Sequence, residues 1–250
     1  MGDKQKIEKI ANKCNINISP FEIINEQDTQ RACEKAVFLV KEGKASSLMK
    51  GLVETSTVMR AVLNKDKGIR DGKKLSHLAA FEVSLYHKLL FVTDAAVNIL
   101  PDVNTKKDII VNAATALNKL GIKNPNIALL AAKEEVDEKM PVTVEYAKLL
   151  DIYNSGAITN CIIDGPFALD NAVSKDAAKI KGIKSLVAGN ADILLCPSIE
   201  AGNILYKSLT ILAGAKAGSV VLGAKRPIVL TSRSDSAESK LVSIALSILF

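Results

Sequence analysis

The residue types best suited to chemistry lie in a short segment near the end of the chain, residues 231–238, with the sequence Thr-Ser-Arg-Ser-Asp-Ser-Ala-Glu. It offers a hydroxyl (Ser232), a guanidinium (Arg233) and a carboxylate (Asp235) at the turn between an apolar, strand-like run and a helical pattern. Such turns lie at the carboxyl edge of a parallel sheet, where ligands dock, and the free N–H groups of the following helix favour an anion. The segment therefore indicates a site for a negatively charged substrate. The alternative is a serine-rich helix cap, in which a serine on either side of Asp235 is the N-cap.

Short apolar runs alternate with helical patterns along most of the chain. The clearest helical pattern covers residues 105–119, with Thr105 as its expected N-cap and Gly121 as its expected C-cap. Short strands joined by helices predict parallel βαβ units with right-handed crossovers. We therefore predict an α/β fold with a mainly parallel sheet. The expected strands cover residues 47–49, 89–93, 127–131, 161–164, 193–196, 220–222 and 228–230.

Several expected strands are followed by polar residues that packing does not require. Because loops after parallel strands share one edge of the sheet, these loops can converge on the same site as residues 231–238. For any single loop the alternative is ordinary loop chemistry, in which Asp and Asn satisfy backbone groups and Gly and Pro make turns. The polar residues in question are Asp94, Asn98, Asp164 and Asn203.

The composition excludes several classes of protein. The chain has 250 residues, is 48% hydrophobic and carries a formal net charge of +6. This charge suits an anionic ligand, but the basic residues do not cluster with aromatic residues as nucleic-acid binding requires. No apolar run reaches the ~18 residues of a membrane span, and the scattered cysteines indicate reduced thiols. We therefore expect a cytoplasmic protein that acts on small molecules, with no nucleic-acid or membrane partner.

The common motifs of metal, nucleotide and hydrolase sites are missing from the sequence. His77 and His87 are the only histidines, and neither has a cysteine at ligand spacing, so we expect no metal site. The phosphate loop and the dinucleotide fingerprint are absent, and so is the nucleophile elbow of hydrolases. These absences exclude the commonest enzyme classes without naming a replacement.

A family resemblance is carried by short segments that follow one another along nearly the whole chain. They are Lys50-Gly51, residues 55–60 (TSTVMR), 75–77 (LSH), 90–101 (LFVTDAAVNILP), 164–171 (DGPFALDN), 188–197 (AGNADILLCP), 200–207 (EAGNILYK) and Ser232-Arg233. No single segment is specific, but in this order they resemble the phosphate acetyl/butyryl transferase family, and most closely its phosphate butyryltransferase branch.

The resemblance implies a two-domain α/β/α fold like that of isocitrate and isopropylmalate dehydrogenases, with the active site in the cleft between the domains. One domain would be discontinuous, residues 1–101 plus 224–250, and the other would be residues 102–223, forming the interface of a homodimer. The implied reaction is acyl-CoA plus phosphate giving acyl phosphate plus CoA, with butyryl or another short acyl chain. CoA is then a substrate, and no tightly bound cofactor is needed.

The same resemblance assigns roles to individual residues. Ser232 would position the thiol of CoA, and Arg233 would stabilise the negative charge that builds on the carbonyl oxygen and the leaving phosphate. Arg60 would bind phosphate with its planar fork, and Arg70 is a weaker second ligand. For His77, a histidine satisfied by the backbone is the favoured interpretation, and contact with phosphate is the alternative. The remaining substrate-binding candidates are Ser76, Asp94, Asn98, Asp164, Asn203, Tyr206 and Lys207.

The chain departs from the family pattern in two places. In the acetyltransferase branch the general base is an Asp seven residues after the serine of the Ser-Arg pair, and here that position is Ser239. Asp235 and Glu238 are the nearby acids, and either one is a candidate for the base. The family also begins with a strand and a helix that have no counterpart before Met1, so we expect one strand of the sheet to be absent.

Three other functions stay open from the sequence. The departures suit a catalytically inactive protein that binds acyl-CoA or phosphate, or a truncated enzyme. The basic surface permits an acyltransferase of the same fold that acts on acyl carrier protein. A decarboxylating dehydrogenase shares the fold but needs carboxylates for a divalent metal, and no such cluster is evident.

Overall fold

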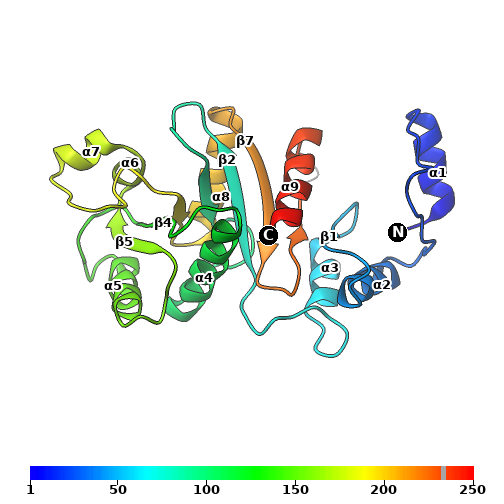
Figure 1. Ribbon diagram of the computed structural model, residues 1–250, viewed down its shortest axis with the longest axis horizontal. Helices are drawn as coiled ribbons and strands as arrows, with labels where there is room; N and C mark the ends of the chain where they lie inside the picture. The colour runs from blue at the N-terminus through cyan, green and yellow to red at the C-terminus, as the bar shows by residue number, and fades with distance from the viewer. Residues whose placement is uncertain (232–234) are drawn as a thin grey trace.

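The fold is described by a computed structural model, which covers residues 1–231 and 235–250. Its strands form one sheet of eight in the order β1-β8-β7-β2-β3-β6-β4-β5 (Figure 1). The strands are β1 (Leu48–Met49), β2 (Ser76–Glu82), β3 (Leu90–Thr93), β4 (Asn126–Leu130), β5 (Ile162–Phe167), β6 (Ile193–Leu195), β7 (Lys216–Leu222) and β8 (Ile228–Val229). The helices are α1 (Lys4–Lys13), α2 (Thr29–Lys41), α3 (Thr55–Val62), α4 (Val103–Lys119), α5 (Pro141–Asn154), α6 (Leu169–Val173), α7 (Lys175–Ile180), α8 (Ile199–Lys207), the π-helix η1 (Ser208–Leu212) and α9 (Ala237–Leu249).

The α/β class is confirmed, and the sheet is mixed. Pairing is parallel for β1 with β8, β3 with β6, β6 with β4 and β4 with β5. It is antiparallel where β2 joins β3 and β7, and where β7 joins β8. The parallel strands β3, β6 and β4 are buried along almost their whole length, as strands covered by helices on both faces must be.

The strand that the sequence did not predict, β2, is antiparallel to both of its neighbours, β3 and β7. Its sequence, Ser-His-Leu-Ala-Ala-Phe-Glu, contains two alanines, which have low strand propensity. Polar and apolar residues do not alternate along it. All of it except Glu82 is buried, because helices cover both faces, so the period-two pattern of a half-exposed strand is missing. The expected 220–222 strand is also longer than predicted, since β7 pairs with β2 from Lys216 to Leu222.

Hydrogen bonding in the sheet runs without a break across the predicted domain division. β7 falls in the predicted second domain, residues 102–223, yet it lies between β8 and β2 of the predicted first domain. The division into two domains, and the specific likeness to the dehydrogenases, stay predictions. At the opposite end of the sheet from β5, the short strand β1 is the edge strand, and α1 stands apart from the sheet beyond it (Figure 1).

The predicted helix at residues 105–119 is confirmed, but its N-cap is not Thr105. The helix begins at Val103, and the carboxylate of Asp102 caps it by accepting a hydrogen bond from the backbone N–H of Thr105 at 2.7 Å. The C-cap is Leu120, and Gly121 follows it with a φ of +87°, the left-handed conformation that commonly ends a helix. Asp102, three residues before the expected start, is a better cap, because the positive end of the helix dipole also stabilises its carboxylate.

Alternating residues of β2 face two different layers of the core. Leu78 and Ala80 pack with α4, α5 and the buried side of α9. Ala79 and Phe81 face the other side, where they pack with residues of α6 and α8. A third cluster lies on the same face of the sheet as Ala79 and Phe81. In it, residues of α2 and α3 pack against Ile228 of β8 and Val221 of β7. Since His77 pairs with Val221 in the sheet register, it lies between the second and third clusters, where the cover of helices changes.

A buried lysine gives a stability prediction. The side chain of Lys106 on α4 is fully buried; its ammonium donates to the carbonyl of Pro101 at 2.7 Å and contacts the carboxylate of Glu145 on α5. We expect Glu145→Ala to lower the free energy of unfolding by about 3–5 kcal/mol, because it leaves a buried charge without its counter-ion. Lys106→Met removes the charge and fills the same space, so it should cost far less. Urea unfolding of both variants tests this; equal losses would contradict it.

Candidate active site

Some of the residues that the sequence singles out line a small cavity on the face of the sheet that β2 turns toward α8: His77, Asn203, Tyr206, Lys207 and Asp235. The cavity has a volume of about 110 Å³. Its walls come from the start of β2, the loop after β3, α8, β7 and the segments on either side of residues 232–234. The lining residues are His77, Ala95, Ala96, Asn203, Tyr206, Lys207, Ser219, Leu230 and Asp235.

The loops after β3 and β6 are joined closely, as the sequence predicts for neighbouring parallel strands. The backbone N–H of Ile199 donates to the carbonyl of Ile99 at 2.9 Å, and the Asn203 amide donates to the carbonyl of Ala95 at 3.2 Å. Gly202 allows the approach, because a Cβ there would lie 2.2 Å from the carbonyl oxygen of Asp94. The beginning of α8 is therefore fixed against the loop that follows β3.

Asp94 holds that loop in shape from beneath the cavity. Its carboxylate is buried and accepts hydrogen bonds from the backbone N–H of His77 at 3.1 Å and of Ala96 and Val97 at 2.9 Å. The amide of Asn98 donates a fourth, at 2.7 Å, and also bonds the carbonyl of Leu75. With its acceptor positions occupied by internal donors, Asp94 is placed to position the loop, and Asn98 ties the loop to the start of β2.

The imidazole ring of His77 lines the cavity, and one of its nitrogens has no hydrogen bond to the backbone. Its side chain is 5% exposed, and Nδ1 is buried with no hydrogen-bond partner in the part of the chain that the structure describes. Burial lowers the pKa of His77, while the negative charges of Asp94 and Asp235 oppose that shift. The ring is therefore neutral at physiological pH. The sequence-based interpretation of a histidine satisfied by the backbone is wrong for this nitrogen.

Tyr206 and Lys207 add a hydroxyl and an ammonium to the same wall. The Tyr206 ring packs edge-on against Phe81 with centroids 5.2 Å apart, and it lies 6.1 Å from the His77 ring. Burial, and then the charge of Asp235, raise the pKa of Tyr206 to about 12, so its hydroxyl keeps its proton. The Lys207 ammonium lies 5.1 Å from the Tyr206 ring centroid. Two donors from α8 thus border the cavity that Asp235 enters from the other side.

The structure separates the two candidate acids. Asp235 is half-buried and lines the cavity, and its charge is felt by both His77 and Tyr206. Glu238 is exposed and forms an ion pair with Lys216 at 3.3 Å, outside the cavity. The alternative interpretation of this segment is also partly right, since Ser236 is the N-cap of α9 and accepts from the N–H of Ser239.

The position of Asp235 depends on how α9 packs against β7. Beyond the reach of the short strand β8, the backbone N–H of Ser219 donates to the hydroxyl of Ser243 at 2.9 Å. That hydroxyl in turn donates to the carbonyl of Ser239 at 2.7 Å. Gly218 lets the helix lie close, because a Cβ there would be 2.5 Å from a methyl group of Val242.

Four predicted substrate ligands lie away from this cavity. Arg60 is exposed on α3 and borders a different groove, between α2 and α3. Arg70 is exposed, and its backbone forms an isolated antiparallel β-bridge with Ala224. Ser76 points to the opposite face of β2, where its hydroxyl accepts from Asn112 at 3.0 Å. Asp164 lies on the edge strand β5. The loops after β3 and β6 and the segment after β8 therefore meet at the cavity, although β8 runs opposite to β3 and β6. Asp164, expected after a strand, lies within β5.

The predicted catalytic residues Ser232 and Arg233 lie outside the described residues. The flanking residues Leu230 and Asp235 both line the cavity. The roles of Ser232 and Arg233 therefore remain those that the family resemblance implies.

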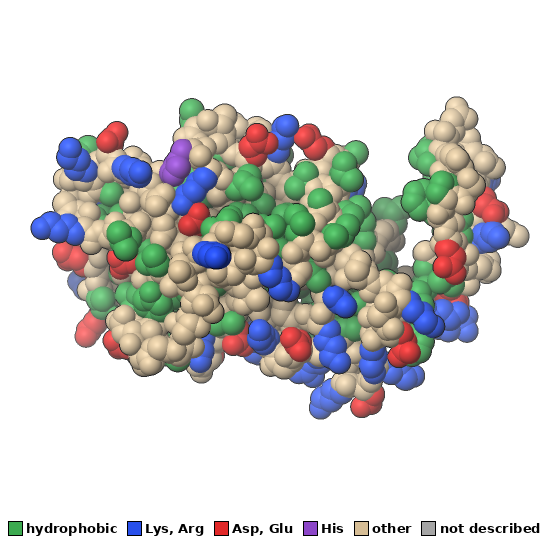
Figure 2. Space-filling view, viewed as in Figure 1, with side chains coloured by type: hydrophobic (Ala, Val, Ile, Leu, Met, Phe, Trp, Pro, Cys, Tyr) green, Lys and Arg blue, Asp and Glu red, His purple; other side chains and the backbone are tan. Residues whose placement is uncertain are grey.

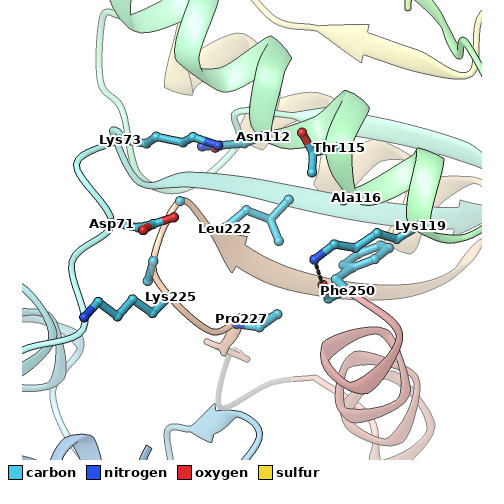
Figure 3. Close-up of a pocket in the computed structure, with 12 residues that line it drawn as sticks. Asp71, Lys73, Asn112, Thr115, Ala116, Lys119, Leu222, Lys225, Pro227 and Phe250 are labelled. Atoms are coloured by element: carbon cyan, nitrogen blue, oxygen red, sulfur yellow. Dashed lines mark hydrogen bonds between the residues drawn. The ribbon is translucent and has the colours of Figure 1, made fainter. Parts of the chain in front are cut away.

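A second cavity, of about 160 Å³, lies on the other face of β2 and holds several lysines (Figure 3). Lys73, Lys119 and Lys225 border it together with Asp71, and the ammonium of Lys119 bonds the backbone oxygen of Phe250. Of the predicted catalytic residues, the two that the structure describes, Asp235 and Glu238, do not line it. Lys and Arg side chains also gather over α2, α3 and the loop after α3, along the lower edge of the view in Figure 2.

The described part of the chain also shows the state of the cysteines, whether metal ligands cluster, and whether any helix could span a membrane. All four cysteines are free, and burial raises the pKa of Cys196, beside the site, to about 12, so its thiol is protonated. Residues 1–231 and 235–250 contain no cluster of three or more His, Cys, Asp or Glu that could hold a metal ion. In the same residues, no helix combines the length and apolar character that crossing a membrane demands.

Comparisons with known proteins agree with this fold. The model of the family described as phosphate acetyl/butaryl transferase matches residues 2–248. The phosphate butyryltransferase of Clostridium acetobutylicum is 46% identical over 249 residues, covering 100% of this chain and 83% of that protein. The phosphate acetyltransferase of Rhizobium meliloti is 42% identical over 98% of this chain and 78% of its own length. The crystal structure of a branched-chain phosphotransacylase from Enterococcus faecalis superimposes with a TM-score of 0.87 at 35% identity, covering 98% and 93% of the two chains.

The mixed α/β fold, the cavity and these relatives define an acyltransferase. The chain belongs to the phosphate acetyl/butaryl transferase family.

Proposed function

We propose that this protein transfers a short acyl group, butyryl or one of similar size, between CoA and phosphate. Acyl-CoA and phosphate give acyl phosphate and CoA, and the reaction runs in both directions. The relatives named phosphate butyryltransferase, at 46–47% identity over the whole chain, support the butyryl group. CoA enters and leaves as a substrate. A homodimer and a cytoplasmic location stay predictions.

The observation that carries the proposal is the meeting of Asp235, Tyr206 and Lys207 around one cavity. Reaction of acyl phosphate with CoA requires loss of the thiol proton and stabilisation of charge on the acyl oxygen and on the departing phosphate. An ammonium and a hydroxyl that keeps its proton are suitable donors to those oxygens. A carboxylate beside them favours the removal of a proton. We assign that role to Asp235, because Glu238 is paired with Lys216 outside the cavity.

Ser232 and Arg233 complete the proposal from the family resemblance, Ser232 holding the thiol and Arg233 stabilising the developing charge. Arg60 and Arg70, which lie away from the cavity, are proposed to bind the phosphate groups of CoA or to approach only when substrate is bound. The positive charge over α2 and α3 (Figure 2) suits the anionic end of CoA.

Release of thiol from butyryl-CoA tests this function. We expect release only when phosphate is present, at a rate that saturates with phosphate, and a fall of about 100-fold in Arg233→Ala, the loss typical of a charge-stabilising donor. Lys123→Ala, a substitution of an exposed lysine that is not among the residues lining the cavity, is the control for loss of one positive charge. Binding of butyryl-CoA without any phosphate-dependent release would favour the inactive binding protein instead.

A further inference from the structure

His77 carries a buried imidazole, and the proposed function gives this side chain no role. Its Nδ1 is buried and has no partner among the described residues, although leaving such a group unpaired costs about 1–3 kcal/mol. The ring nonetheless lines the same cavity as Asp235, Tyr206 and Lys207. Its backbone is fixed at both ends of the residue: Asp94 accepts from its N–H, and the hydroxyl of Thr93 donates to its carbonyl at 2.7 Å. A rigidly held, unsatisfied ring at a cavity wall is arranged for a substrate.

We propose that the imidazole of His77 is the group that takes the proton from the thiol of CoA, with Asp235 stabilising the imidazolium that results. The proposal rests on the phosphate acyltransferase function and deepens it, because the position of the family's aspartate base is Ser239 here. It replaces a single carboxylate base by a pair, a histidine that moves the proton and an aspartate that supplies the charge.

The step balances without any further reactant. The thiol gives its proton to the imidazole of His77, and the sulfur electron pair forms the bond to the acyl carbon. The bond between that carbon and the phosphate oxygen breaks, and its electron pair stays on the phosphate. The imidazolium then gives its proton to the departing phosphate, so the products are acyl-CoA and hydrogen phosphate. In the reverse direction the same ring takes a proton from hydrogen phosphate and returns it to the sulfur.

The other groups around the ring are less suited to move this proton. Asp94 is committed to four internal donors. Tyr206 and Cys196 hold their own protons, because burial raises the pKa of each to about 12. Lys207 brings positive charge, which opposes protonation of the ring, whereas Asp94 and Asp235 favour it. Burial lowers the pKa of His77 and keeps it neutral, the form that can accept.

The test compares His77→Gln with wild type in the direction from butyryl phosphate to butyryl-CoA. Glutamine is of similar size and hydrogen-bonds but cannot take up the proton. We expect kcat to fall by about 100-fold to 10,000-fold, the usual contribution of a general base, with the dissociation constant for desulfo-CoA changed by less than about threefold. In wild type kcat should fall as pH drops through the pKa of His77, and this acid limb should vanish in His77→Gln.

His87 provides the matched control. It is the only other histidine, it is exposed, and its ring contacts Asn190 far from the cavity. His87→Gln should keep both kcat and the acid limb. If His77→Gln does not fold, judged by its circular dichroism, His77→Asn replaces it. Retention of kcat within about threefold in a folded His77 variant, or an unchanged acid limb, would overturn the proposal.

A readout that does not depend on turnover separates this proposal from the proposed function. With two histidines in the chain, the imidazole resonances of His77 can be assigned by their survival in His87→Gln. We expect saturating desulfo-CoA and phosphate to shift the His77 resonances and leave those of His87 in place. A His77 resonance that ignores both ligands would overturn the role of the ring even in an active enzyme, whereas a wild type without turnover would instead count against the acyltransferase function.

Discussion

Asp235→Asn is expected to lower kcat by about 100-fold or more, while Glu238→Gln stays within about twofold of wild type. Asp235 lines the cavity and its charge acts on His77 and Tyr206. Asparagine keeps the shape of the side chain but removes the charge that stabilises a protonated ring, and the loss of such a charge beside a catalytic histidine is severe. Glu238 is exposed and paired with Lys216, and an exposed ion pair contributes little.

The measurement is the rate of thiol release from butyryl-CoA at saturating phosphate, with both variants shown to melt like wild type. The pair is a controlled comparison, because Asp235 lies two residues before α9, Glu238 lies in its first turn, and both substitutions remove one negative charge. Equal losses in the two variants would mean that net charge near α9 matters and that the cavity assignment is wrong.

Asp94→Ala is expected to destabilise the protein by about 3–5 kcal/mol and to abolish most activity. It removes the acceptor of four hydrogen bonds, three from backbone N–H groups and one from Asn98. Each buried donor left without a partner costs about 1–3 kcal/mol, and partial relaxation of the loop recovers some of that sum. The same loop packs against Gly202 at the start of α8, so its collapse would displace Tyr206 and Lys207.

Asn98→Ala is the graded control for this effect. It removes one donor to Asp94 and the bond to the carbonyl of Leu75 but leaves the three backbone bonds in place. We expect a loss of about 1–2 kcal/mol and an activity reduced far less than in Asp94→Ala. Urea unfolding and thiol release measured on both variants give the comparison. A fully stable Asp94→Ala would contradict the role of the carboxylate as the organiser of the loop.

The parallel half of the sheet was predictable because its strands are short apolar runs separated by helices. Residues 89–93, 127–131 and 193–196 were assigned within one or two residues of β3, β4 and β6. β2 was not predictable from periodicity, since burial on both faces removes the alternation and the Ala79-Ala80 pair weakens the strand signal. Its antiparallel pairing with β3 and β7 is a long-range property that no local pattern encodes.

The candidate site was predictable only in part, for a related reason. Residue type and position after a strand singled out Asp235 and Asn203, and the family resemblance added Tyr206 and Lys207; all four line one cavity. The sequence could not choose between Asp235 and Glu238, because that choice depends on where the start of α9 turns. It also could not separate His77 from Ser76, neighbours in the chain whose side chains face opposite sides of β2. The missing signal was the existence of β2 as a strand, since successive residues of a strand alternate in direction.

The most direct test of the central claim is the identity of the product formed from butyryl-CoA and phosphate, followed by phosphorus nuclear magnetic resonance together with a thiol assay. We predict that an acyl phosphate signal grows in equal amount with free CoA thiol, and that both disappear when butyryl phosphate and CoA are supplied for the reverse reaction. Thiol released with free butyrate and no acyl phosphate would show hydrolysis instead of transfer to phosphate, and would contradict the account.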